Sequence, residues 1–309
     1  MFTRWSQTLS GQHLSGYQTD QFANAAVQLY WLHGNGFNSL AYQPIFDALL
    51  QTPFRSNDTV GLGIYATDLP GHGHSSMPVD DWPNWRGMAH DVERVIQLQG
   101  SDAVKPLRLG VGHSLGSVVT LLQAYRYPQR FDRILLLDPV LFSPLIMAGQ
   151  QTAKTLGLWT KLPLSKKALR RGDRWSSAQS MLQQLAGKKF YQRWHPQALS
   201  GFVEGGHRPL SSAGQPAEAV ELACSPQWEA RIFASYPKQL WQALKQIKIP
   251  VTIICANNSM PFVLRGAKRA ASLNSNISYR IWGEGHCFPM EQPQQTAELI
   301  GDWIRADSA

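Results

Sequence analysis

Cysteine is scarce in this chain, and long hydrophobic runs are missing. The 309 residues include only three cysteines, Cys224, Cys255 and Cys287, whose spacing fits neither a disulfide framework nor a metal site. No stretch approaches the roughly 18 consecutive apolar residues of a membrane span, and the first seven residues lack the hydrophobic segment of a secretory signal. We therefore expect a cytoplasmic protein with no membrane span, no disulfides and no bound metal.

Acidic residues are also few, and the resulting positive charge is local. The formal net charge is +8, and between residues 142 and 208 eleven Lys and Arg residues stand against two acidic ones. A basic patch can attract nucleic acid, anionic lipid or acidic substrates. No nucleic-acid-binding motif accompanies it, so we expect no nucleic-acid partner. A solvated helical face is the favoured interpretation, and contact with anionic groups is the alternative.

Short apolar runs alternate with helical patterns along most of the chain. The candidate strands are 27–32, 63–67, 107–111, 133–137, 249–255 and 277–282, and the candidate helices are about 39–50, 85–98, 117–125, 262–271 and 293–304. This alternation is typical of a parallel sheet with crossover helices. We therefore predict an α/β fold with a doubly wound, mostly parallel sheet.

The alternation stops between about Val140 and Pro237. This segment is helical in pattern, basic and rich in tryptophan, and it shows no clear strand. It predicts a helical cap (140–237) inserted into a core made of residues 1–139 and 238–309. The tryptophans of the segment either line an apolar substrate pocket or hold small helices together; they are Trp159, Trp175, Trp194 and Trp228.

The most informative motif is a serine between two glycines, Gly112-His113-Ser114-Leu115-Gly116. A strand pattern precedes it and a helical pattern follows. The G-x-S-x-G spacing needs small flanking residues because the serine sits in a strained turn, where larger side chains two positions away would collide. The turn presents the serine hydroxyl beside the free N–H groups of a helix N-terminus, which stabilise an anion. We predict that Ser114 is a nucleophile.

A serine hydroxyl is a poor nucleophile until a neighbouring base takes its proton. Among the nine histidines, His286 differs because it directly follows the last predicted strand. The carboxyl ends of parallel strands share one edge of a sheet, so this loop can approach Ser114. We predict that His286 is the base, that Cys287 beside it is a packing residue, and that His113 points away from the serine.

These motifs resemble those of the α/β-hydrolase fold with a helical cap. Three further segments carry the resemblance: His33-Gly34-Asn35-Gly36, Asp68-x-Pro70-Gly71-x-Gly73-x-Ser75 and Glu291-x-Pro293. The resemblance implies Ser114 as nucleophile, His286 as general base, and an oxyanion hole made by the backbone N–H groups of Asn35 and Leu115. It implies no metal and no organic cofactor. The first segment is similar to haloalkane dehalogenases, but Ser114 replaces their aspartate nucleophile, which argues against dehalogenation.

The position of the acid departs from the usual pattern of this superfamily. The segment after strand 249–255 reads Ala256-Asn257-Asn258-Ser259 and holds no carboxylate. Some members place the acid after the preceding core strand, and that position here holds Asp138. We predict that Asp138 orients His286. Glu284 is the second candidate, and a Ser–His dyad without an acid is the third.

The combination predicts a serine hydrolase that cleaves a carboxylic ester or a related acyl bond, such as a thioester or an activated amide, through an acyl-enzyme. A small-molecule acyl substrate is the expected partner, held in an apolar pocket below the cap. Two alternatives stay open. One is C–C bond hydrolysis or lyase chemistry on the same fold, and the other is a ligand receptor with slow turnover.

Overall fold

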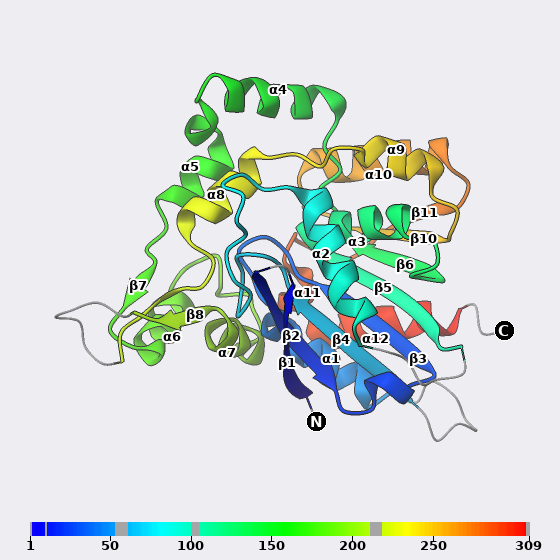
Figure 1. The fold of residues 1–309 in the computed structure, drawn as a ribbon, viewed down its shortest axis with the longest axis horizontal. Coiled ribbons are helices and arrows are strands. Elements are labelled where there is room, and N and C mark those ends of the chain that lie inside the picture. The colour runs from blue at the N-terminus through cyan, green and yellow to red at the C-terminus, as the bar shows by residue number, and fades with distance from the viewer. Residues whose placement is uncertain (1, 10, 53–60, 100–104, 211–217, 307–309) are drawn as a thin grey trace.

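An eight-stranded sheet forms the centre of the molecule (Figure 1). The computed structural model describes residues 2–9, 11–52, 61–99, 105–210 and 218–306. In spatial order the strands are β1 (Phe2–Leu9), β2 (Gln12–Thr19), β4 (Leu62–Asp68), β3 (Val27–Leu32), β5 (Leu107–His113), β6 (Arg133–Leu137), β10 (Val251–Cys255) and β11 (Ile277–Ile281). The six strands from β4 to β11 are parallel.

The chain changes direction at β3, which makes the sheet doubly wound. It runs from β3 to β4 on one side and then crosses to β5 on the other side of β3. The carboxyl ends of β3 and β5 therefore flank the switch point where such sheets bind ligands. The predicted fold class is confirmed.

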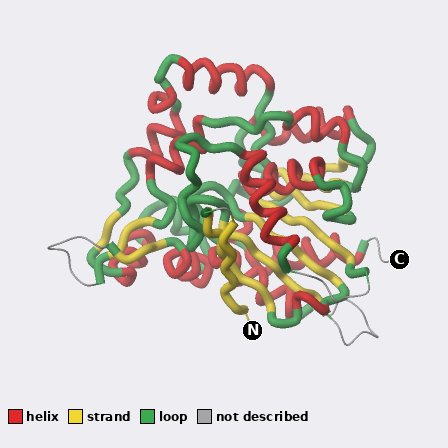
Figure 2. The backbone as a smooth tube through the Cα atoms, in the orientation of Figure 1, coloured by secondary structure: helices red, strands yellow, loops and turns green. Residues whose placement is uncertain are grey.

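Helices cover both faces of the sheet, as Figure 2 shows in red. One face carries α2 (Trp85–Gln97), α3 (Leu115–Arg126), α9 (Leu240–Gln246) and α10 (Pro261–Leu273), and the other carries α1 (Gln43–Leu50) and α12 (Pro293–Arg305). Every residue of β3 is buried, as expected for a strand covered on both sides. Among the described residues, no helix has the length and hydrophobicity to cross a membrane.

The antiparallel hairpin of β1 and β2 at one edge was not predicted. It pairs with β4 through β2, and the indole Nε1 of Trp5 donates to the Ala66 carbonyl at 3.2 Å. Most side chains of β1 are exposed or half-buried. A strand of this kind has little hydrophobic patterning, so the sequence gives no clear signal for it.

Between β6 and α9 the described residues form five α-helices and three short strands, besides the 3-10 helix Trp159–Lys161. They are α4 (Pro144–Thr155), α5 (Pro163–Leu169), β7 (Arg174–Trp175), α6 (Ala178–Ala186), α7 (Pro196–Gly205), β8 (His207–Pro209), β9 (Val220–Leu222) and α8 (Pro226–Ala234). The expectation that this segment holds no strand is wrong, because β7, β9 and β8 form a small antiparallel sheet. Strands of two or three residues are too short to show a two-residue alternation. The boundaries at 139/140 and 237/238 stay a prediction.

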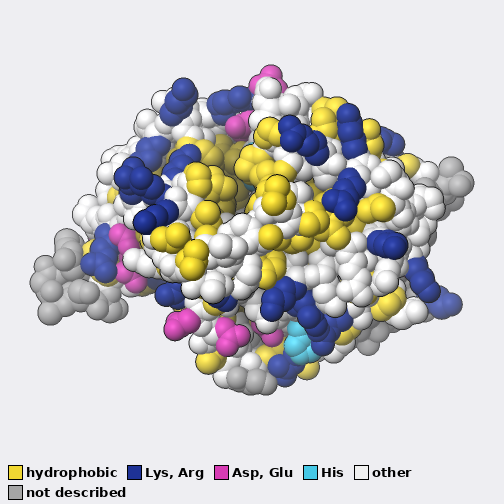
Figure 3. Space-filling model, turned by 90° about the horizontal axis from the view of Figure 1, so that it is seen from above, with side chains coloured by type: hydrophobic (Ala, Val, Ile, Leu, Met, Phe, Trp, Pro, Cys, Tyr) yellow, Lys and Arg dark blue, Asp and Glu magenta, His cyan; other side chains and the backbone are white. Residues whose placement is uncertain are grey.

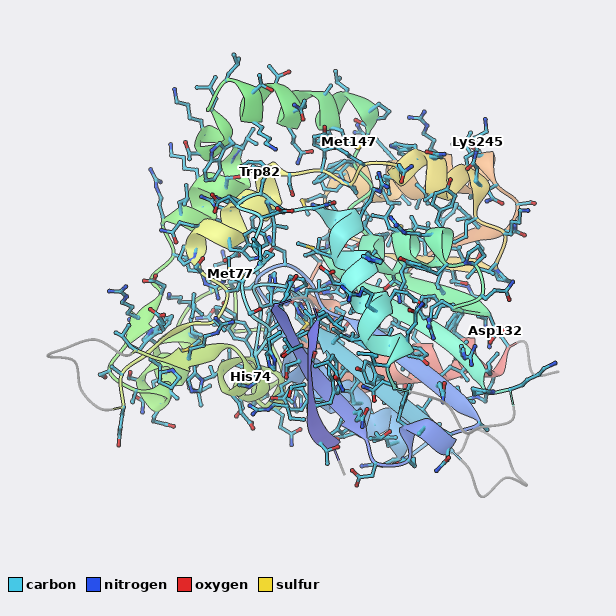
Figure 4. The ribbon with its side chains drawn as sticks, in the orientation of Figure 1. His74, Met77, Trp82, Asp132, Met147 and Lys245 are labelled. Atoms are coloured by element: carbon cyan, nitrogen blue, oxygen red, sulfur yellow. The ribbon has the colours of Figure 1, made fainter. Side chains whose placement is uncertain are left out.

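Polar and aromatic contacts hold the segment between β6 and α9 against the loops after β3 and β4. The indole Nε1 of Trp228 in α8 donates to the Pro70 carbonyl at 3.0 Å, and the amide of Asn38 donates to the Phe202 carbonyl in α7 at 2.8 Å. Trp82, labelled in Figure 4, packs edge-on against Trp159 with ring centroids 5.6 Å apart. The segment is therefore held against the carboxyl edge of the sheet at several points.

The packing of α1 against the sheet gives a test of stability. Phe46 of α1 is fully buried, whereas Phe190 is 48% exposed. We expect Phe46→Ala to lower the free energy of unfolding by about 3–5 kcal/mol, because it leaves a cavity in the core. Phe190→Ala is the matched control and is expected to cost about 1 kcal/mol or less. Urea unfolding followed by circular dichroism measures both, and equal losses would contradict the packing described.

Candidate active site

Ser114 lies in a strained turn between β5 and α3. Its backbone angles are φ 55° and ψ −112°, a region that side-chain-bearing residues rarely adopt. A Cβ atom at position 112 would collide with the backbone of Gly116, and one at position 116 would collide with the backbone of Leu32. The two glycines therefore permit the turn, and the serine is the residue that carries its strain.

The turn brings Ser114 into hydrogen-bonding distance of His286. The serine Oγ lies 2.9 Å from His286 Nε2. His286 belongs to the loop between β11 and the short helix α11 (Phe288–Glu291). Two residues that are 172 positions apart in the chain thus meet at the carboxyl edge of the sheet, as the sequence motifs predicted.

Asp138 completes a chain of hydrogen bonds with these residues. Its Oδ2 lies 2.6 Å from His286 Nδ1, and its side chain is fully buried directly after β6. A carboxylate only accepts hydrogen bonds, so the neutral imidazole carries its proton on Nδ1. That tautomer leaves the lone pair of Nε2 free to accept the proton of the Ser114 hydroxyl.

The loop after β10 holds Asp138 in place, which the sequence did not reveal. The backbone N–H of Ala256 donates to Asp138 Oδ1 at 2.8 Å, and the hydroxyl of Ser259 donates to Oδ2. This loop is the segment after β10 that holds no carboxylate of its own. The loop supplies hydrogen-bond donors for the carboxylate of Asp138 instead. The hint in the sequence was Ser259, a hydroxyl-bearing residue in a loop that holds no carboxylate.

Glu284, the second candidate acid, is directed elsewhere. Its side chain is 63% exposed and its Oε2 lies 2.5 Å from the guanidinium of Arg193. No hydrogen bond between Glu284 and His286 is present in the described part of the chain. The geometry favours Asp138 over Glu284.

Two buried residues, His113 and Cys287, are direct neighbours of His286. His113 points away from Ser114, with Nε2 2.8 Å from the His286 carbonyl oxygen and Nδ1 2.7 Å from the Tyr42 hydroxyl. Burial lowers the pKa of His113 to about 3, so its ring stays neutral beside His286. Burial raises the pKa of the Cys287 thiol, which fits a packing residue rather than a nucleophile.

Asn35 and Leu115 lie beside the serine with unused backbone donors. Leu115 is the first residue of α3, where N–H groups have no partner within the helix. Among the described residues, neither backbone N–H has a protein acceptor. Two hydrogen bonds hold the loop after β3. The Gly36 N–H donates to His72 Nε2 at 3.0 Å, and the side-chain Nδ2 of Asn35 donates to the backbone carbonyl of Glu229 at 3.1 Å.

A cavity of about 500 Å³ opens above Ser114 and His286. Its wall is formed both by residues of the segment between β6 and α9 and by residues outside that segment. The apolar part of the wall is formed by Phe37, Trp85, Val140, Phe142, Leu164, Leu185, Phe190, Ile232, Phe233, Met260 and Phe262. The tryptophans of the inserted segment are absent from the described lining. They pack between elements instead, as Trp194 does against Phe202 with ring centroids 5.8 Å apart.

The comparison with protein families agrees with this architecture. A model described as "Alpha/beta hydrolase family" matches residues 29–299. The chain belongs to the alpha/beta hydrolase family. The predicted resemblance to this family is thereby confirmed for residues 29–299.

Three proteins that resemble this chain share 16–26% of its aligned residues. The type I acyl-CoA thioesterase mpaH of Penicillium roqueforti is 26% identical over 202 residues, which is 63% of this chain and 43% of that protein. The chain thus spans less than half the length of that curated relative. The peroxisomal α/β-hydrolase Lpx1 of Saccharomyces cerevisiae has a TM-score of 0.73 at 16% identity, covering 99% of this chain and 89% of its own. A thioesterase domain from the curacin biosynthetic pathway has a TM-score of 0.69 at 17% identity, covering 97% and 99%.

The close packing at Gly116 can be tested by adding a side chain. We expect Gly116→Val to lower the free energy of unfolding by about 1–3 kcal/mol or more, because the new Cβ meets the rigid backbone of Leu32. Gly149→Val in α4 is the matched control, since a Cβ there has open space around it. Urea unfolding of both variants measures the difference. Equal stability of the two variants would refute the described packing of the turn.

Proposed function

We propose that this α/β-hydrolase is a serine hydrolase that cleaves a carboxylic ester or thioester through an acyl-enzyme. The observation that carries the proposal is the continuous hydrogen-bond chain from Ser114 through His286 to Asp138, at 2.9 and 2.6 Å. Nucleophile, base and orienting acid at these distances are the arrangement that activates a serine. Asp138 directly follows β6. The three residues therefore occur along the chain in the predicted order Ser, Asp, His.

In the first half-reaction the Ser114 hydroxyl attacks the carbonyl carbon of the substrate. His286 Nε2 takes the hydroxyl proton as the Oγ–carbon bond forms. Asp138 accepts the Nδ1–H hydrogen bond and stabilises the positive imidazolium by its charge. The backbone N–H groups of Asn35 and Leu115 donate to the oxygen that becomes negative.

The tetrahedral intermediate then collapses and releases the alcohol or thiol. His286 gives its proton to the leaving group, and the acyl group stays on Ser114. In the second half-reaction His286 takes a proton from water, whose oxygen attacks the acyl carbon. Release of the carboxylic acid returns the proton to Ser114, so residues of the chain carry out every proton transfer.

The cavity supports a substrate with a small or medium-sized apolar acyl group. Its volume of about 500 Å³ lies in the range of small-molecule sites. The names of the Penicillium relative and of the curacin domain, both thioesterases, support a thioester as one substrate class. A cytoplasmic location stays our inference, supported by three buried free cysteines.

Substitution of the proposed catalytic residues tests this function. With a short-chain p-nitrophenyl ester, Ser114→Ala is expected to reduce kcat at least about a thousandfold. Asp138→Asn is expected to reduce kcat by about 10⁴-fold, because an amide favours the wrong imidazole tautomer. Glu284→Gln, the control for a nearby acid, is expected to change kcat less than about twofold.

Stopped-assay kinetics and circular dichroism of the three variants separate lost chemistry from lost folding. An ester turnover that is equal in the wild type and in folded Ser114→Ala would refute the proposed hydrolase. A larger loss in Glu284→Gln than in Asp138→Asn would refute Asp138 as the acid.

A further inference from the structure

The cavity wall above Ser114 contains four basic side chains but one acidic side chain in the described lining. The basic residues are Lys167, Arg170, Arg171 and Lys188, and the acid is Glu229. Arg171 is neutralised, because its guanidinium lies 2.8 Å from the Glu229 carboxylate and 2.9 Å from the Tyr191 hydroxyl. The cavity therefore retains three positive charges that no acid in its described wall balances.

The three remaining cations form one group, which we call the basic rim: Lys167, Arg170 and Lys188. Lys167 lies in α5, Arg170 directly follows that helix, and Lys188 follows α6. In the described part of the chain none of the three has a carboxylate within ion-pair distance. Lys167 and Arg170 are exposed and Lys188 is half-buried, so their charges are at the open side of the cavity.

The basic rim lies close to the reactive centre as well as to the apolar wall. All three residues of the basic rim line the same cavity as Ser114 and His286. The Lys167 ammonium also lies 5.9 Å from the centroid of the Phe190 ring. Figure 3 shows Lys and Arg side chains beside a hollowed area of hydrophobic side chains on this face.

The three unbalanced cations repel one another and give the open side of the cavity a positive field, which water and salt screen in part. A ligand with a negative group relieves this repulsion, and Lys and Arg bind carboxylate and phosphate oxygens by charge-assisted hydrogen bonds. The apolar wall meanwhile suits a hydrocarbon chain. Such a site is complementary to a ligand that has both a negatively charged group and a hydrocarbon chain.

We infer that the basic rim selects acyl substrates that carry a carboxylate or phosphate group. The inference rests on the proposed function, since it places the negative group relative to a reacting acyl carbon near Ser114. Lys167, Arg170 and Lys188 are then specificity residues that bind the negative group and take no part in the chemical step. The alternative from the sequence, a merely solvated helical face, gives no preference between charged and neutral substrates.

Two matched substrate pairs locate the negative group. The first pair is the p-nitrophenyl ester of adipate, with a free carboxylate, and the same compound with that carboxylate methylated. The second pair is hexanoyl-coenzyme A, with phosphates on the leaving group, and the hexanoyl thioester of N-acetylcysteamine, without phosphate. We expect a higher kcat/KM for the charged member of at least one pair, and the pair that shows it identifies carboxylate or phosphate.

Glutamine variants connect the preference to the basic rim. Each of Lys167→Gln, Arg170→Gln and Lys188→Gln is expected to lower the charged-to-neutral ratio of kcat/KM about 2- to 5-fold, through KM and not kcat. The triple variant is expected to lower it at least about tenfold. Lys166→Gln and Lys189→Gln are matched controls, because these exposed neighbours do not line the cavity, and they are expected to leave the ratio unchanged. Added salt is expected to reduce the wild-type ratio.

Failure of this inference is distinguishable from failure of the proposed function. A wild type that turns over neutral esters with a ratio unaffected by the triple substitution would overturn the basic-rim inference alone. A wild type without turnover would overturn the proposed function, and binding then tests the basic rim by itself. Calorimetry on Ser114→Ala measures Kd for the intact adipate monoester and for hexanoyl-coenzyme A. The inference is supported if Ser114→Ala binds at least one of these compounds more tightly than its neutral partner and loses this difference when the three glutamine substitutions are added. Equal Kd values for charged and neutral compounds refute it.

Discussion

The backbone of Ser114, held at a positive φ between β5 and α3, is the constraint on which the site depends. Such a conformation is costly for a residue with a side chain. It persists here because Gly112 and Gly116 let the turn pack directly on its own backbone and on β3. The compact turn places the hydroxyl at the start of a helix, at the edge of the sheet where the chain changes direction. The strained backbone conformation of Ser114 therefore determines where its hydroxyl lies.

The carboxylate beside His286 and the groups that hold this carboxylate in place follow two different strands of the sheet. His286 Nδ1 lies beside a carboxylate, and that carboxylate belongs to Asp138, which directly follows β6. Asp138 also has a positive φ, 44°, and it is tied to the neighbouring β10 through the Ala256 N–H and the Ser259 hydroxyl. The loops after β6 and β10 divide the task, because one supplies the charge and the other supplies the donors that orient it.

Much of the fold was predictable because its strands are buried on both faces and read as continuous apolar runs, as in β3 and β6. The turn at Ser114 and the approach of His286 to it were predictable because glycine spacing and strand-end position are local signals. The hairpin of β1 and β2 and the small sheet of β7, β8 and β9 were not, because exposed or very short strands lack a pattern. Ser259 and the pairing of Arg171 with Glu229 were also hidden, since both depend on contacts between segments far apart in the chain.

We expect the alignment with His286 to make Ser114 reactive, and covalent labelling measures this reactivity. A neutral fluorophosphonate should react at Ser114, located by tandem mass spectrometry in the tryptic fragment 109–126, which also contains the hydrogen-bonded Ser117. The labelling rate should fall at least about a hundredfold in His286→Gln. A label on Ser117 or Cys287, or a rate that is unchanged in folded His286→Gln, would contradict the account.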